Sequence, residues 1–377
     1  MQLFKVRTVA ALLVLLALVC TAPVLGNQDI ESDVSVETTA ETGADAPETE
    51  DGAKPGKTKK QRDPNRGRIL PIPIFITEPA VGDGFGLVLA YFHRVDGKPD
   101  GKMIGSPESI SAADREQTPP PTVTGVFGAY TSNDTAIIGV GHMNSFKDDH
   151  IRFTAAGAIA DINSTFYVSD QPFKFNLEGS FLYQDTRFRI RDSRWFWGIA
   201  ASYLDASTAF QVELPEDPPL DFFRSDLANV GLAGEVAWDT RDSTSMPNKG
   251  KLFNLAAWRY DDAIGGDFDY WDVRAKWNSF HQLHERFVLG WRLQYSAISG
   301  RAPFFAVPFV SLRGIPALRY QGERVAVAEI EGRYNFTPKW AMIGFAGKGW
   351  ASSDIPIIET EQNIRSFGIG GRYKIFD

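Results

Sequence analysis

The most constraining feature of this chain is a strict alternation of side-chain character between residues 268 and 298. Trp271, Val273 and Trp277 alternate with charged or polar residues, and after a short turn Leu289 and Trp291 belong to the same alternation. A period of two belongs to extended strands, whose successive side chains point to opposite faces. One face here is aromatic and apolar, and the other is charged or small. The pattern suits a sheet with lipid on one side and water on the other.

The same alternation recurs from Ile69 onward, without a convincing amphipathic helix. The expected strands cover residues 69–78, 85–94, 122–131, 135–146, 150–161, 173–186, 195–206, 226–240, 250–262, 268–281, 286–298, 323–336, 339–351 and 366–376. They number about fourteen, and single-chain bacterial barrels have an even number of strands. Residues 69–377 are therefore predicted to be all-β, an antiparallel transmembrane β-barrel. A soluble β-sandwich, whose strands also alternate, is the alternative.

The first 26 residues have the composition of a secretory signal peptide. Lys5 and Arg7 precede an apolar run that ends at Cys20, and small or permissive residues follow up to Gly26. This run is too short for a transmembrane helix. Cys20 is the only cysteine, and its lipidation is the alternative to cleavage after Gly26. An exported chain without disulfides fits a bacterial envelope, so we expect the outer membrane of a Gram-negative bacterium.

Residues 27–68 differ from the rest of the chain. They are acidic as far as Asp51 and basic from Lys54 to Arg68, with few apolar residues. Such a segment cannot bury enough apolar surface to fold, so we expect a disordered tether. Its basic half could contact outer-membrane lipid, including lipopolysaccharide phosphates; a solvated tether is the alternative. The net charge of −8 argues against a nucleic-acid partner. No partner protein is indicated, and we expect a monomer.

The connections between the expected strands alternate in length. Short turns are expected at residues 191–194, 281–285 and 337–338, and long, outward-facing loops at 207–225, 299–322 and 352–365. The segment 95–121 is also long, yet the alternation of strand directions puts it at the end that carries the short turns. That placement is unusual for a bacterial barrel, whose periplasmic turns are short.

Two motifs resemble a known family. Asp239 and Arg241, followed by Pro247 and Gly250, resemble the strand–turn–strand of BamA/TamA-type outer-membrane barrels, the bacterial surface antigen family. Further on, Leu312, Arg313, Gly314 and Ile315 resemble the tip of that family's long loop, which folds back into the lumen. Three expected strands lie between the two motifs, as in the family. The resemblance covers residues 69–377 and implies an outer-membrane barrel with a lumenal loop.

The chemistry of Arg313 supports a lumenal loop independently. An arginine inside a barrel needs anionic partners, because an unpaired and partly desolvated charge is costly. On the strand after the loop, Glu329, Glu331 and Arg333 share one parity, which predicts that they face the interior. Our hypothesis is that Arg313 pairs with Glu329 or Glu331 and holds the loop inside as a plug. An ordinary surface turn with a solvated arginine is the alternative.

The sequence departs from the family in three respects. The family's assembly members carry an aspartate in an F-x-D-x-G pattern, whereas Phe345 to Gly349 has Gly347 at that position. The tether has neither the length nor the pattern of the periplasmic POTRA modules found in BamA. The resemblance implies about sixteen strands, with five after the loop, and only three are found. Either the barrel closes with fourteen, or its last hairpin is missing.

Catalytic and cofactor sites are not indicated. His281 and His284 have a spacing seen in some metal sites, but a third ligand is lacking and a turn explains them better. The segment from Gly82 to Gly86 resembles a phosphate loop only superficially, because no helix follows it, and we expect a flexible hairpin there. No serine–histidine pair is supported. We therefore expect no enzyme, no cofactor and no metal.

Three functions remain open. The first is a BamA/TamA-type barrel lacking POTRA modules, active in envelope biogenesis or in export through a loop-occluded barrel. The second is a passive diffusion pore, because barrels of this size can leave an aqueous channel unless they are plugged. The third is a structural barrel whose surface loops at 207–225 and 352–365 contact partners. A lumenal Arg313 loop favours the first over the second.

Overall fold

The protein forms one curled antiparallel sheet. The computed structural model describes residues 67–93, 120–168, 171–212, 220–244, 246–337, 340–354 and 361–373. Within them, fourteen strands form a single sheet in which each strand pairs with its neighbours in the sequence. The predicted signal peptide (1–26) and nearly all of the predicted tether (27–68) lie outside the described residues. The expectation of an all-β, antiparallel barrel is confirmed.

The strands follow the alternating segments of the sequence closely. They are β1 (Arg68–Glu78), β2 (Gly82–Phe92), β3 (Val123–Thr131), β4 (Ala136–Phe146), β5 (Ile151–Val168), β6 (Gln171–Arg189), β7 (Trp195–Val212), β8 (Leu220–Asp239), β9 (Gly250–Tyr260), β10 (Asp269–His284), β11 (Phe287–Arg301), β12 (Arg324–Asn335), β13 (Trp340–Ser352) and β14 (Glu361–Tyr373). Two short 3-10 helices, η2 (Asp262–Ile264) and η3 (Phe304–Ala306), interrupt the loops. No helix in the described residues is long and apolar enough to cross a membrane.

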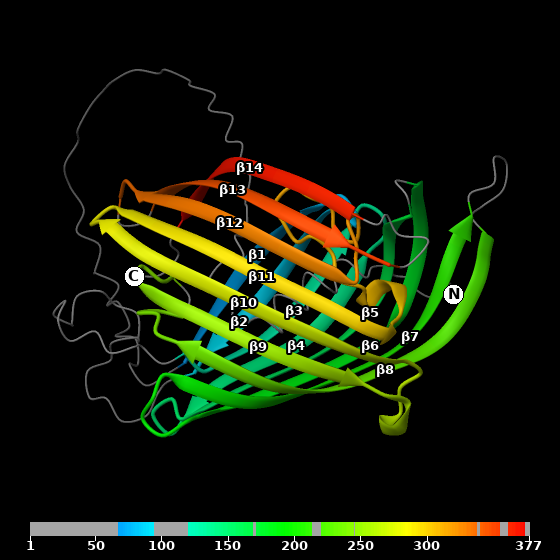
Figure 1. The fold of residues 1–377 in the computed structure, drawn as a ribbon, viewed down its shortest axis with the longest axis horizontal. Helices are drawn as coiled ribbons and strands as arrows, with labels where there is room; N and C mark the ends of the chain where they lie inside the picture. The colour runs from blue at the N-terminus through cyan, green and yellow to red at the C-terminus, as the bar shows by residue number, and fades with distance from the viewer. Residues whose placement is uncertain are drawn as a thin grey trace, which may run out of the picture.

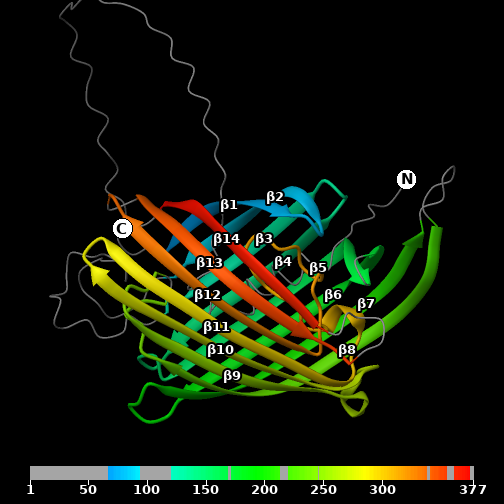
Figure 2. The ribbon, with the colours of Figure 1, turned by 45° about the horizontal axis from the view of Figure 1, so that its top comes forward.

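The sheet curls round until β14 and β1 lie on the same side of the molecule (Figure 1; Figure 2). Among the described strands, β1 pairs only with β2 and β14 only with β13. The two outer edges of the sheet are therefore not joined by a hydrogen-bonded ladder in this structure. We call the gap between them the seam.

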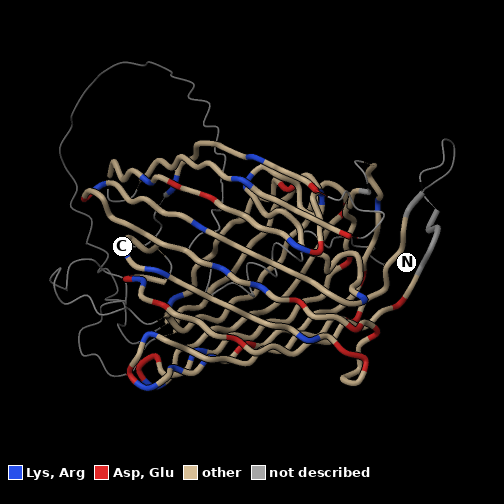
Figure 3. Tube along the Cα trace, in the orientation of Figure 1, with Lys and Arg blue, Asp and Glu red and all other residues tan. Residues whose placement is uncertain are grey.

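The two faces of the sheet differ as the period of two requires. Large apolar side chains such as Leu87, Leu182 and Leu293 are exposed on the outer face. Charged residues also occur within the strands of the wall, not only at its ends (Figure 3). On the inner face, Nη2 of Arg187 lies 2.9 Å from Asp185 and 2.7 Å from Glu235, and all three are buried. An apolar exterior around an interior that holds paired charged groups is the pattern of a barrel in a membrane.

Tryptophans lie together on the outer face. The Trp195 and Trp238 rings stack with centroids 6.1 Å apart, and the same distance separates the stacked Trp277 and Trp291. Aromatic rings are amphipathic and collect where a membrane meets water. The stacked tryptophan pairs on the outer face therefore fit a surface that meets a membrane interface.

Several loops are shorter than the sequence suggested. Much of the predicted 207–225 loop continues β7 and β8, and residues 361–365 of the predicted 352–365 loop belong to β14. Residues 82–86 are the start of β2, so the hairpin turn is 79–81 instead. These expectations were wrong because glycine and polar residues weakened the alternation, whereas pairing with a neighbouring strand stabilises such residues in a sheet. Most of the predicted 95–121 loop lies outside the described residues.

Candidate functional site in the barrel lumen

The carboxylates of the site come from β12. Glu329 and Glu331 are each 7% exposed and Arg333 is 3% exposed, whereas Ile330 is 49% and Tyr334 42% exposed. Alternation along one strand therefore turns the three charged side chains inward and the apolar ones outward. The structure places all three predicted residues on the inner wall.

The segment between β11 and β12, residues 302–323, folds back inside the barrel, and we call it the lumenal loop. It enters the lumen because it is largely apolar and gains free energy when that surface leaves water. The Phe304 ring lies 5.0 Å from the Phe166 ring and 4.8 Å from the Phe175 ring, both on the inner wall. Its buried apolar residues are Phe305, Val307, Val310, Leu312, Ala317 and Leu318.

Arg313 is held by two carboxylates. Its Nη2 donates to Oε1 of Glu329 at 2.7 Å and its Nε to Oε2 of the same carboxylate at 3.4 Å. Its Nη1 donates to Oε2 of Glu331 at 2.9 Å. A planar guanidinium suits this forked arrangement, which a lysine could not reproduce. The structure thus brings the loop arginine onto two carboxylates that lie 16 and 18 residues further along the chain.

A tight turn presents the arginine. The amide of Ile315 donates to the carbonyl of Leu312 at 3.2 Å, which closes a four-residue turn. Gly314 has a φ of 75°, a left-handed conformation that glycine adopts without a steric penalty. Leu312 is buried, and Ile315 packs against the same apolar cluster. The four motif residues therefore place one cation in the lumen between two apolar anchors.

The next strand shows how the departure at Gly347 is accommodated. The guanidinium carbon of Arg313 lies 3.9 Å from the centroid of the Phe345 ring, a cation–π contact. A Cβ at Gly347 would come within 2.6 Å of Leu312 Cδ2. The glycine thus leaves room for the loop, and an aromatic face contacts the arginine on the strand where the family carries an aspartate.

Two further arginines complete the site and were not predicted. Arg292 on β11 donates from Nη2 to the carbonyl of Ser311 at 2.9 Å. Arg372 on β14 donates from Nη2 to both oxygens of Glu331, at 3.1 and 3.2 Å. Both have the inward parity of their strands. The sequence pattern could have marked them as lumenal, but not as neighbours of Glu329 and Glu331, because strand register is not a local property.

The turn motif forms a second buried cluster. Asp239 and Arg241 are both 0% exposed, and Arg241 Nε donates to Asp239 Oδ1 at 3.0 Å. Arg152 of β5, which was not predicted, donates from Nη1 to Oδ2 of the same carboxylate at 2.9 Å. Gly250 has a φ of 100°, and a Cβ there would lie 2.2 Å from the carbonyl oxygen of Thr240. Only glycine fits at that position.

Arg333 links the two motifs. Its Nη2 donates to the carbonyl of Pro247 at 3.2 Å and also to the side-chain oxygen of Asn248. Arg333 belongs to the strand that carries the Arg313 partners, and Pro247 to the turn that follows Asp239. The structure therefore joins the turn motif and the loop-binding strand within the lumen.

The histidines do not form a joint site. His281 and His284 both belong to the end of β10, not to a turn. Ser279 Oγ lies 2.8 Å from His281 Nε2, a serine–histidine pair that the sequence did not indicate. The serine is 0% exposed, so a substrate could not reach its hydroxyl. No group of three potential metal ligands occurs among the residues the structure describes.

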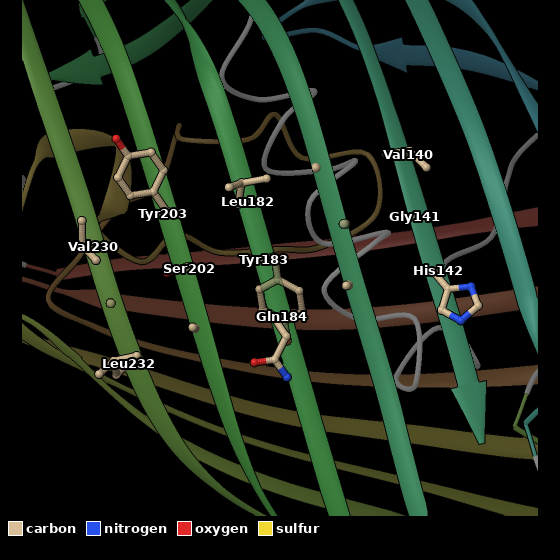
Figure 4. Close-up of a pocket in the computed structure, with 15 residues that line it drawn as sticks. Val140, Gly141, His142, Leu182, Tyr183, Gln184, Ser202, Tyr203, Val230 and Leu232 are labelled. Atoms are coloured by element: carbon tan, nitrogen blue, oxygen red, sulfur yellow. The ribbon is translucent and has the colours of Figure 1, made fainter. Parts of the chain in front are cut away.

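A hollow of about 490 Å³ lies on β4 to β8, away from the lumenal site (Figure 4). The side chains that rim it include Leu182, Tyr203 and Leu232, which are exposed on the outer face. It therefore opens toward the surroundings of the barrel and contributes nothing to the Arg313 site.

Comparison with solved structures identifies the same kind of barrel. BamA from Haemophilus ducreyi lacking POTRA domains 1-3 matches with a TM-score of 0.54 and 12% identity, over 82% of this chain and 64% of that one. CdiB from Escherichia coli matches with a TM-score of 0.51 and 12% identity, over 80% and 56% respectively. The chain thus spans less than two thirds of either protein. No family model and no curated protein matches the sequence.

These likenesses concern the fold. The BamA-type resemblance that the two motifs predicted is confirmed at that level, because BamA and CdiB match the fold of this chain. The lumenal arrangement around Arg313 follows from the contacts in this chain.

Proposed function

We propose that this protein is a non-catalytic barrel of the BamA/TamA type in the outer membrane of a Gram-negative bacterium, active in envelope biogenesis or export. Its lumen is occluded by its own loop, and lipid or protein passes only when that loop moves. The fold likeness to BamA supports the outer-membrane location. Outer-membrane lipid is the expected surrounding, and a monomer the expected state.

The observation that carries this proposal is the attachment of Arg313 inside the barrel. Two carboxylates and one aromatic ring contact a single guanidinium. The side chains alone of Arg313, Glu329 and Glu331 are only 19%, 4% and 9% exposed. Charged groups buried to this extent are costly to desolvate and must be paired. A passive pore does not require a charged loop tip bound inside its lumen. A plug that must be both held and released requires such an attachment.

The alternatives have less support. A surface barrel working through its loops would need long loops at 207–225 and 352–365, and the strands take up much of both segments. A diffusion pore needs an open lumen, whereas residues 302–323 pack on the inner wall.

Single-channel conductance in planar bilayers tests the proposal. Refolded wild-type protein should be closed or flicker, and Arg313→Ala should open because the loop loses its ionic attachment. Arg286→Ala, in the exposed turn after β10, removes an arginine that is not in the loop and should behave as wild type. A steadily open wild type that Arg313→Ala leaves unchanged would make the protein a diffusion pore.

A further inference from the structure

The lumenal loop touches both edges of the sheet. The edges, β1 and β14, share no ladder in the described residues. Past its first residues, the loop nevertheless packs on the inner face of β12 to β14 from Val310 to Arg313, and it reaches the turn between β1 and β2 at Ala317. It lies inside the barrel, where the orange segment after β11 can be followed in both views (Figure 1; Figure 2).

On the β14 side the attachment is apolar and ionic. Val310 and Leu312 belong to one buried cluster with Ile364 of β14. Glu331 accepts from Arg313 of the loop at 2.9 Å and from Arg372 of β14 at 3.1 Å. One carboxylate thus binds the loop tip and the last strand together. Because it is 7% exposed, loss of either arginine leaves charge that water only partly compensates.

On the β1 side the attachment is a partly buried hydrogen bond. The amide of Ala317 donates to Oε1 of Glu78, the last residue of β1, at 3.0 Å. The amide of Ala80 donates to the same oxygen at 3.3 Å. Ala317 and Leu318 are 3% and 0% exposed and belong to the buried cluster that contains Val81 of the β1–β2 turn.

We propose that the lumenal loop is a strap across the seam, so that the loop leaves the lumen only when the β1 and β14 edges separate. This inference deepens the proposed function and rests on it, because the strap is the same loop that occludes the barrel. Glu78 and Glu331 are its two attachment points. Within the described residues, where β1 and β14 share no ladder, the loop contacts both edges, and this couples the plug to the seam.

Hydrogen–deuterium exchange of the full-length protein in lipid nanodiscs tests the coupling. Arg313→Ala should speed amide exchange in β1 and β14 roughly tenfold, as loss of a charged hydrogen bond allows, and leave β6 unchanged. Glu78→Ala and Arg372→Ala should speed exchange in residues 302–323. Arg365→Ala, on the opposite face of β14, is the matched control for Arg372 and should have no effect on the loop. Faster exchange in the loop of Arg313→Ala with wild-type exchange in both edges would overturn the strap.

A disulfide variant keeps the test decisive if single variants fold poorly. Val310 Cβ lies 3.3 Å from an ideal Cβ at Gly349, near the span of about 3.5–4.5 Å between bridged residues. With Val310→Cys and Gly349→Cys added to Arg313→Ala, oxidation should return β1 and β14 to slow exchange and reduction should speed it. Equal exchange in both redox states would refute the coupling.

Hydrogen–deuterium exchange is measured without a transported molecule or an ion current, so its result is independent of the conductance experiment. If wild type is an open pore in bilayers but the exchange of loop and edges rises together, the proposed function fails and the strap stands. If the barrel is closed but loop and edges exchange independently, the strap fails and the proposed function stands.

Discussion

The two motif sites of this barrel both pair arginine with carboxylate. They differ in how deeply the ion pair is buried and in how far apart the partners lie in the sequence. Asp239 and Arg241 are two residues apart and fully buried, and Arg152 adds a second cation. Arg313 is 19% exposed and lies on a loop, 16 residues from Glu329. The first site is part of the wall itself, whereas the second holds a separate segment against the wall. Full burial, as at Asp239, makes the ion pair a requirement for folding. Partial exposure, as at Arg313, leaves an ion pair that can break.

The largest effect should come from Asp239→Asn. The amide keeps the shape but removes the charge that two buried guanidinium groups share, which we expect to cost about 3–5 kcal/mol of unfolding free energy. Urea unfolding followed by tryptophan fluorescence measures it. Asp242→Asn in the same turn should change little, because among the described residues its oxygen accepts from the backbone amides of Asn248 and Lys249, and an asparagine oxygen can accept from them too. Equal effects of the two changes would remove the distinction between the sites.

Phe196→Leu should have the next largest effect. The ring is 1% exposed and lies 4.3 Å from the Arg152 guanidinium and 4.5 Å from that of Arg189. Leucine keeps an apolar side chain but has no π face, so we expect a loss of about 2 kcal/mol. Phe188→Leu, which removes an outer-face stack on Trp197, is the control. A smaller loss at Phe196 than at Phe188 would argue against the cation–π contribution.

Arg313→Ala should destabilise the barrel less, by about 1–2 kcal/mol of unfolding free energy, because the residue is partly exposed and its loss affects the loop and the two edges of the seam rather than the whole wall. Of the variants considered, however, Arg313→Ala should change the channel conductance most. Urea titration and bilayer recording of the same preparation measure the effect on stability and the effect on conductance separately. If Arg313→Ala destabilised the barrel as much as Asp239→Asn, the loop would be part of the wall and not a separable plug.

The smallest expected effect concerns two glycines of β13, where substitution by alanine should change the unfolding free energy in opposite directions. A Cβ at Gly349 would lie 2.2 Å from Val310 Cγ1, whereas at Gly344 nothing lies within 4 Å. Gly349→Ala should therefore cost about 1 kcal/mol by overpacking the loop. Gly344→Ala should be neutral or slightly stabilising, because alanine loses less backbone entropy in a strand. Thermal unfolding of both variants checks the difference, and equal shifts would show that the loop yields without cost.

Much of the architecture was predictable because strands produce a local alternation of apolar and polar residues in the sequence. All fourteen strands overlap their predicted segments, although β5, β7 and β8 extend six or seven residues beyond the predicted ends. The parity of Glu329, Glu331 and Arg333 marked them as inward-facing. The errors fell at strand ends, such as residues 207–212, where pairing with a neighbour extends a strand beyond its own pattern. Arg292, Arg372 and Arg152 were missed as partners although their parity was readable.

The sequence by itself therefore determined the fold class, the inner and outer faces and the residues able to enter the lumen, because a period of two depends only on adjacent residues. Only the tertiary structure decided which inward side chains meet. Pairing of Arg313 with Glu329 and Glu331, the sharing of Glu331 with Arg372 and the contact of Ala317 with Glu78 depend on strand register and on the path of a loop. Those are set by packing across the whole barrel, where residues hundreds of positions apart become neighbours.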